Sequence, residues 1–152
     1  MLIRNASPLD VEDIVNTYNT AMKEKTNNCY TGEELEEIQL DLKKDQLRDF
    51  IISCNETTNQ IIVGTYNGKI VATGGFVGDH SEKFFKIILI SSLIKNGGRL
   101  ILTKLLNRLK DAEEIFLESS LSAIGFYKKF GFVENGEIDE FLFKSQPMRL
   151  QK

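Results

Sequence analysis

The chain has 152 residues, of which 41% are hydrophobic and 27% are charged, a composition typical of one globular domain and unlike that of a disordered or fibrous protein. Its 19 basic and 22 acidic residues give a net charge of −3, which argues against nonspecific binding to nucleic acid, because neutralising phosphate charge supplies most of that affinity. The N-terminus lacks the apolar segment of a signal peptide, and no apolar run approaches the roughly 18 residues needed to cross a membrane. We therefore expect a single domain over residues 1–152, in the cytoplasm and without a membrane partner.

The cysteine and histidine content does not favour a metal site. Cys29 and Cys54 belong to no Cys-x-x-Cys motif, and His80 is the only histidine. A structural zinc site needs four ligands at characteristic spacings. We therefore expect no bound metal and two reduced thiols, as is usual in the cytosol.

The N-terminal third of the sequence predicts a strand followed by two helices. Residues 2–6 have strand character, and Ser7-Pro8 is typical of a helix start, because serine caps the helix and proline fits its first turn. Apolar residues at helical spacing continue this helix to about residue 25. Thr31 and Glu34 fit the capping-box pattern, which predicts a second helix with an apolar stripe that reaches Ile51.

A β-hairpin is predicted next. Residues 60–66 are rich in β-branched side chains, and Asn67-Gly68 is the strongest short hairpin signal. The return strand is expected to run from residue 69 towards residue 77, with a bulge or a close backbone approach at Gly74-Gly75.

The second half of the sequence predicts further alternation of strands and helices. Residues 84–90 form a nearly unbroken apolar run, as expected for a central strand. A loop then leads into a helix whose apolar stripe is Leu100, Leu102, Leu105, Leu106 and Leu109. A strand at 115–117, a helix over 122–130 and closing strands at 132–133, 141–143 and 148–150 complete the chain. This order predicts an α+β or mixed α/β domain of three layers.

The loop Lys95-Asn96-Gly97-Gly98-Arg99 has features of an anion-binding turn. Glycines allow close backbone approach, and the exposed amides at the start of a helix attract phosphate. Lys95 and Arg99 add positive charge. A Gly-Gly turn before a helix is also a common connection, so the loop alone leaves both interpretations open.

Residues 123–132 carry a more specific signal. They fit the pattern A-x-x-F-Y-x-K-x-G-F, which resembles the end of the GNAT superfamily of N-acetyltransferases. The strand and Ser7-Pro8 helix start, the Asn67-Gly68 hairpin, and the strand 84–90 with its glycine loop and leucine-rich helix resemble the rest of that family, in the same order. The resemblance implies the GNAT fold, with a mostly antiparallel sheet flanked by helices. It also implies transfer of an acetyl group from acetyl-CoA to a primary amine, directly within a ternary complex.

The resemblance also implies where acetyl-CoA binds. The strands 84–90 and 115–118 would splay apart, with the backbone of Leu89 and Ile90 holding the pantetheine arm. The pyrophosphate would lie on the loop and helix start formed by Lys95, Asn96, Gly97, Gly98, Arg99 and Leu100. Leu100 stands where the family has a small residue, and Ser120 stands where many members have asparagine to contact the cofactor.

The resemblance implies a residue for the acid of the reaction, but it leaves the base open among several candidates. Tyr127 matches the family tyrosine that protonates the departing thiolate, and a phenol is a suitable acid for that step. The central strand lacks the carboxylate that some members use as a base. Glu118 is the first candidate, since burial at the end of its strand would raise its pKa; His80, Glu82 or a chain of waters are the others.

Substrate selection is expected from residues 27–34 and 135–146. The first segment offers Tyr30 and Glu33 as substrate-binding residues, beside Cys29. The sequence does not identify the amine substrate. By resemblance to the family, a homodimer is expected. Two other classes stay open: a module that binds acyl-CoA without turnover, and an interaction protein that pairs through the apolar residues 141–143.

Overall fold

The structure is a computed structural model that describes residues 1–26, 30–38, 43–54, 58–79, 81–140 and 144–151. Within these ranges, seven strands form one sheet in the order β1-β2-β3-β4-β5-β7-β6. All neighbouring strands are antiparallel except β4 and β5, which are parallel. The strands are β1 (Leu2–Asn5), β2 (Asn59–Tyr66), β3 (Lys69–Asp79), β4 (Phe84–Ser92), β5 (Glu114–Ser120), β6 (Phe132–Glu134) and β7 (Ser145–Leu150).

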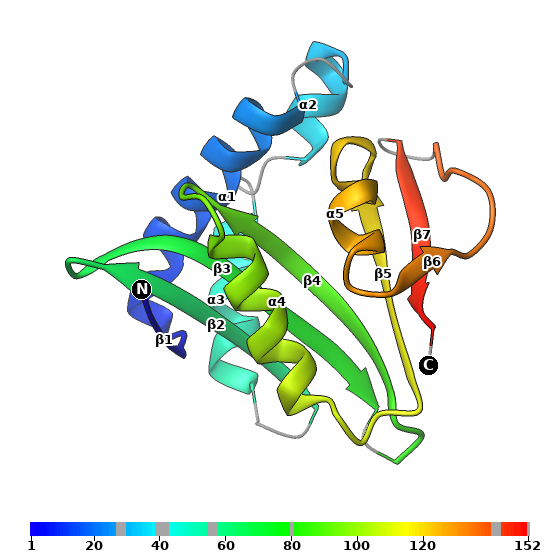
Figure 1. The fold of residues 1–152 in the computed structure, drawn as a ribbon. Coiled ribbons are helices and arrows are strands. Elements are labelled where there is room, and N and C mark those ends of the chain that lie inside the picture. Colours follow the sequence, from blue (N-terminus) through cyan, green and yellow to red (C-terminus); the bar gives the residue numbers. More distant parts are fainter. Residues whose placement is uncertain (27–29, 39–42, 55–57, 80, 141–143, 152) are drawn as a thin grey trace.

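Helices cover both faces of the sheet (Figure 1). The helices α1 and α3 pack on one face and α4 packs on the other, while α5 lies beside β5. The fold is thus the predicted α+β domain of three layers, with a mostly antiparallel sheet. The helical elements are η1 (Pro8–Asp10), α1 (Val11–Thr26), α2 (Gly32–Ile38), α3 (Lys44–Ser53), α4 (Gly97–Arg108), η3 (Leu121–Ala123) and α5 (Ile124–Lys128).

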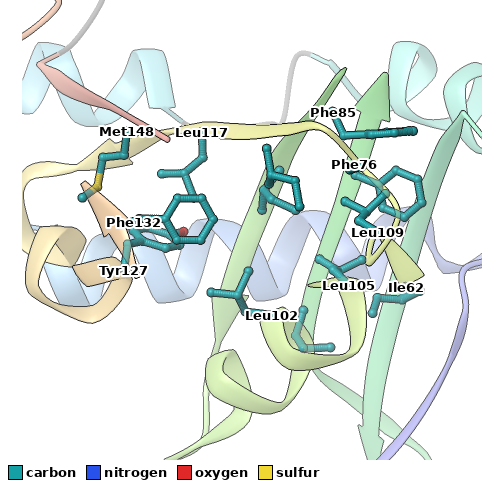
Figure 2. Close-up of a cluster of buried hydrophobic side chains, with 14 of the residues drawn as sticks. Ile62, Phe76, Phe85, Leu102, Leu105, Leu109, Leu117, Tyr127, Phe132 and Met148 are labelled. Atoms are coloured by element: carbon teal, nitrogen blue, oxygen red, sulfur yellow. The ribbon is translucent and has the colours of Figure 1, made fainter. Parts of the chain in front are cut away.

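Two apolar cores hold the layers together. The larger joins α4 and α5 to the sheet, and Figure 2 shows it extending from Ile62 and Phe76 to Tyr127, Phe132 and Met148. The smaller joins α1 and α3 to the opposite face of β2 and β3 through side chains such as Ile14 and Val63, both fully buried. Burial of apolar area on both faces is the main stabilising contribution in a sheet covered on two sides.

Local sequence signals are confirmed where a short segment decides the geometry. Asn67 and Gly68 have φ of 52° and 78°, the positive values that a two-residue hairpin turn requires. Glu34 and Thr31 form the predicted reciprocal cap, with the Thr31 amide 3.1 Å from Glu34 Oε1 and the Glu34 amide 3.2 Å from Thr31 Oγ1. The expected bulge at Gly74 is also present, because the β3–β4 register shifts between Thr73 and Gly75.

Three predictions about elements were wrong. The second helix does not reach Ile51, since α2 ends at Ile38 and a separate helix, α3, begins at Lys44. Leu100 is not part of the apolar stripe of α4: it is 43% exposed, and the neighbouring Ile101 is fully buried instead. The helix over 122–130 is only Ile124–Lys128, preceded by a turn of 3-10 helix. The strand predicted at 141–143 lies outside the described residues.

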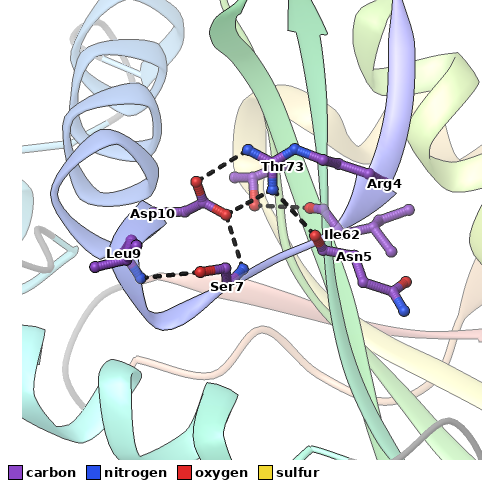
Figure 3. A network of polar contacts seen from close by, with 7 residues as sticks. All are labelled: Arg4, Asn5, Ser7, Leu9, Asp10, Ile62 and Thr73. Carbon is purple, nitrogen blue, oxygen red and sulfur yellow. Dashed lines mark hydrogen bonds and ion pairs between the residues drawn. The ribbon is translucent and has the colours of Figure 1, made fainter.

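A polar network fixes the junction between β1 and the first helical turn (Figure 3). Asp10 accepts hydrogen bonds from Arg4 at 2.7 and 3.0 Å and from the Ser7 amide at 2.7 Å. The Ser7 hydroxyl accepts from the Leu9 amide at 3.2 Å, which completes the cap. The Arg4 hydrogen bond is the main reason that the pKa of Asp10 lies below its usual range; partial burial opposes it, and the Ser7 amide and the Arg4 charge add to the lowering.

This network leads to a pH-dependent stability prediction. Because the pKa of Asp10 is lower in the folded protein, its stabilisation is complete above the unfolded value near 4 and is lost as pH falls through the folded value. We expect Asp10→Ala to cost about 1–2 kcal/mol of unfolding free energy at pH 7, with a smaller difference from wild type below pH of about 4. Urea unfolding at several pH values measures both effects. Glu134→Ala, which removes the exposed 2.9 Å pair with Lys128, is the control and should cost under about 0.5 kcal/mol.

Candidate active site

The parallel strands β4 and β5 separate soon after they meet. Only Phe84–Lys86 of β4 pair with Glu114–Phe116 of β5, and the remaining halves of the strands diverge (Figure 1). A cavity of about 1020 Å³ opens where they diverge, bordered by β4, the start of α4, α1, the end of β5 and α5. We call it the β4–β5 cleft. The splay that the family resemblance implied is therefore present.

The backbone of β4 is irregular where it lines this cleft. The register with β3 passes from Gly75–Ile88 to Thr73–Ser91, so Leu89 and Ile90 have no partner in that register. Leu89 has φ of 58°, a strained value for a residue with a side chain. Both residues were predicted to hold the pantetheine arm, and both lie in the cleft wall. A bulge of this kind leaves main-chain polar groups available to a ligand.

The start of α4 forms the second part of the cleft wall. Lys95, Asn96, Gly98 and Arg99 line the cleft, whereas Gly97 and Leu100 do not. The Gly97 amide donates to the Ile94 carbonyl at 3.2 Å and the Leu100 amide donates to the Asn96 carbonyl at 3.1 Å. Helix formation thus already engages both amides, and the prediction that they bind the cofactor has no support from this geometry.

The amides of Gly98 and Arg99 differ from those two. Among the described residues, neither has a backbone acceptor, as is usual for the first turn of a helix. A Cβ atom at Gly98 would lie 3.5 Å from the Phe126 ring, so this glycine keeps the space between α4 and α5 open. Two free amides, a helix N-terminus and the cations Lys95 and Arg99 suit a diphosphate.

Tyr127 lies on α5 at the inner end of the cleft. Its side chain is 7% exposed and packs edge-on against Phe132, with ring centroids 5.9 Å apart. Burial raises the pKa of Tyr127 well above its usual range, and the nearby Tyr18 raises it further. The hydroxyl therefore keeps its proton throughout the neutral range, and none of the described residues forms a hydrogen bond with it. It can act as a donor towards a ligand in the cleft.

Glu118 does not have the environment that its predicted role as a buried base requires. The alternation along β5 buries Leu117 and Ser119 and leaves Glu118 on the outer face, with 42% of its side chain exposed. It borders the cleft, but its carboxylate lies 3.8 Å from Lys86 Nζ. The burial on which its predicted role as a base rests is therefore absent. Ser120 follows in the cleft wall, with its hydroxyl 3.4 Å from that of Ser122.

Tyr30 and Glu33 are not among the residues that line the cleft. The Tyr30 hydroxyl donates to the Lys144 carbonyl at 2.5 Å and accepts from the Leu121 amide at 3.0 Å, so it links the segment before α2 to η3 and to the residue before β7. Glu33 is exposed on α2. The structure thus brings neither residue into the cleft: Tyr30 joins distant segments and Glu33 lies on the surface, and their contact with substrate stays a prediction. Glu82 is exposed in the turn before β4 and also lies outside the cleft wall, whereas Cys29 and His80 lie outside the described residues.

Helix α1 supplies a wall of the cleft that the sequence did not predict. Tyr18, Ala21 and Met22 lie on one face of this helix, at the spacing of i, i+3 and i+4, and border the cleft together with Ser91 of β4. The apolar spacing in this segment predicts a helix and does not indicate a cleft. Burial raises the pKa of Tyr18 to about 12, with a contribution from Tyr30. No signal in the sequence distinguishes a stripe that faces a core from one that borders a cleft.

Within the described part of the chain, no cluster of three or more potential metal ligands occurs, and no helix is long and apolar enough to span a membrane.

Comparisons with known proteins place this architecture in a family. The model of the acetyltransferase (GNAT) domain matches residues 26–152. PaiA N-acetyltransferase from Thermoplasma acidophilum, solved in complex with coenzyme A, superposes with a TM-score of 0.80 at 17% identity, covering 99% of this chain and 98% of that one. A GCN5-related N-acetyltransferase from Rhodopseudomonas palustris gives a TM-score of 0.81 at 14% identity, covering 99% and 95%. No curated protein matches the sequence.

The matched domain includes most of the chain, and the fold agrees with it over nearly the whole length. The chain belongs to the GNAT acetyltransferase family, and by family it is an acetyl-CoA-dependent N-acetyltransferase.

Proposed function

We propose that residues 1–152 act as one GNAT domain that binds acetyl-CoA in the β4–β5 cleft and transfers the acetyl group directly to a primary amine. The observation that carries this proposal is that one cleft is lined by Gly98 and Arg99, by the bulge at Leu89 and by Tyr127. The pairing of β1 with β2 and the position of α1 at the border of the cleft support a single domain that includes both elements.

The residues of the cleft fit acetyl-CoA in their chemistry. Lys95, Arg99 and the two amides would hold the diphosphate, and the backbone of Leu89 and Ile90, at the break in the β3–β4 register, would hold the pantetheine amides. Ile90 and Phe126 give this part of the wall an apolar surface suited to a methylene-rich arm. Ser120 lies in the wall beyond them. When bound, acetyl-CoA supplies a thioester carbonyl that an amine can attack.

The chain's own contribution is to position the reactants and to supply a hydrogen-bond donor. Tyr127 keeps its proton and would donate a hydrogen bond to the sulfur of the departing thiolate, where negative charge develops as the C–S bond breaks. The cleft borders both α1 and α4, so an amine can approach from the α1 side while the α4 side is occupied. Holding both reactants in one cleft makes direct transfer possible without a covalent enzyme intermediate.

A transfer assay with several amines tests this proposal. The protein would be incubated with acetyl-CoA and, separately, spermidine, alanine amide, Nα-acetyl-lysine amide and kanamycin, and the released thiol and the product mass would be measured. Acetylation of at least one amine above the uncatalysed rate is expected. Binding of acetyl-CoA with no transfer to any of them would favour a binding module instead.

The proposal includes two expectations that rest on the sequence and the family resemblance: a cytoplasmic location and assembly into a homodimer. Sedimentation equilibrium of the purified chain tests the second, and a monomer at micromolar concentration would contradict it.

A further inference from the structure

One polar atom in the wall of the cleft has no partner. The Ser91 side chain is 5% exposed, and its hydroxyl oxygen is the single buried side-chain polar atom without a hydrogen-bond partner among the described residues. The opposite residue in the β3–β4 register, Thr73, is fully buried too, but its hydroxyl donates to the Ile62 carbonyl at 3.2 Å. Leaving a buried hydroxyl unpaired destabilises the folded protein, so its retention calls for an explanation.

The position of Ser91 in β4 places it on the α1 side of the cleft. Leu89 packs against the core that includes α1, and Ile90 packs against the core that includes α4. Beyond the bulge the register is regular again, and the Ser92 hydroxyl lies against the start of α4, where it accepts a hydrogen bond from the Ile94 amide at 3.1 Å. Side chains alternate along a regular strand, so Ser91 faces the opposite, α1 side. Tyr18, Ala21 and Met22 border the cleft on that side, whereas the amides and cations suited to the diphosphate lie at the start of α4.

The chemistry of this side suits an amine. A hydroxyl oxygen accepts hydrogen bonds from N–H groups, and the neighbouring side chains of Ala21 and Met22 offer apolar contact to the carbon that bears the nitrogen. The phenol of Tyr18 adds a second hydroxyl to the same wall. Glu24 and Lys25, further along α1, place charges at the border of the cleft.

We infer that Ser91 is a substrate-positioning residue whose hydroxyl accepts a hydrogen bond from the acceptor amine on the α1 side of the β4–β5 cleft. The inference rests on the proposed function and extends it. It names the side chain that would bind the amine substrate, and that side chain has no other hydrogen-bond partner among the described residues.

The test compares Ser91→Ala with Thr73→Val, which removes the neighbouring hydroxyl that has a partner. For the amine that wild type acetylates fastest among the four named above, kcat/KM should fall about tenfold in S91A, with most of the change in the KM for the amine. The Kd for acetyl-CoA, measured by calorimetry, should stay within about twofold of wild type. The Tm of S91A should equal or exceed that of wild type, whereas T73V should lower Tm by roughly a few degrees and leave the KM for the amine unchanged.

A pair of variants of equal size separates the hydroxyl from the volume of the side chain. Ser91→Thr keeps the hydroxyl and should retain most of the activity, whereas Ser91→Val should behave like S91A. Wild-type kcat/KM in S91A, or a loss confined to acetyl-CoA affinity, would overturn the inference and leave the proposed function intact. If wild type acetylates none of the four amines, the proposed function is overturned and the inference falls with it.

Discussion

Replacing Tyr127 by phenylalanine should lower the rate of acetyl transfer by about 10²-fold or more while leaving acetyl-CoA binding intact. A positioned proton donor contributes roughly 10²- to 10⁴-fold to such reactions. The Tyr127 hydroxyl has no hydrogen-bond partner among the described residues, and its ring packs in the larger core. The variant therefore keeps the apolar contacts and loses only the donor.

Three measurements test this expectation. Steady-state rates give kcat, calorimetry gives the Kd for acetyl-CoA, and thermal unfolding shows that the variant is folded. Because burial raises the pKa of Tyr127, its deprotonation should not reduce wild-type activity below pH of about 10. Full activity of Y127F would exclude Tyr127 as the donor, and a loss of wild-type activity between pH 8 and 10 would have to come from another group.

Phe132→Ala should destabilise the folded protein strongly. Phe132 is 1% exposed and packs against Tyr127 in the larger core (Figure 2). Removing a buried phenylalanine side chain costs about 3–5 kcal/mol, because apolar contacts are lost and a cavity remains. For a domain of this size, that corresponds to a fall in Tm of roughly 10 °C.

The matched control is Phe116→Ala on the outer face of β5. Phe116 is 38% exposed, so its removal should cost about 1 kcal/mol or less. Calorimetric unfolding of the three proteins gives both values. If the two substitutions destabilised the protein equally, the assignment of the larger core to the face of the sheet that α5 covers would be contradicted. Transfer activity of F132A should also fall, because the ring beside Tyr127 fixes the position of the phenol.

Short-range signals explain why much of the fold was predictable. The hairpin at Asn67-Gly68, the cap at Ser7 and the capping box at Thr31 each depend on a few neighbouring residues, and each is confirmed. Leu100 was misplaced because the expected stripe relied on the leucines alone. The observed helix buries Ile101 and Leu105, four residues apart, and this phase turns Leu100 towards solvent.

The site was less predictable because it depends on contacts between distant segments. Tyr30 forms hydrogen bonds with Leu121 and Lys144, 91 and 114 residues away. The residues next to Tyr30 in the sequence do not predict these contacts. The wall formed by Tyr18 and Ser91 exists only because β4 and β5 diverge beside α1. Resemblance to a family predicted a cofactor loop at residues 95–100, but it could not show which amides the helix itself engages.

The β4–β5 cleft is expected to bind acetyl-CoA with its diphosphate at the start of α4. Calorimetric titration of acetyl-CoA into wild type, Arg99→Glu and Lys104→Glu tests this assignment most directly. Both substitutions reverse one exposed charge on α4, but only Arg99 lines the cleft.

We expect a wild-type Kd in the micromolar range, at least about tenfold weaker binding by R99E, and a change of less than about twofold in K104E. No binding by wild type at millimolar acetyl-CoA, or equal binding by R99E and wild type, would contradict the assignment.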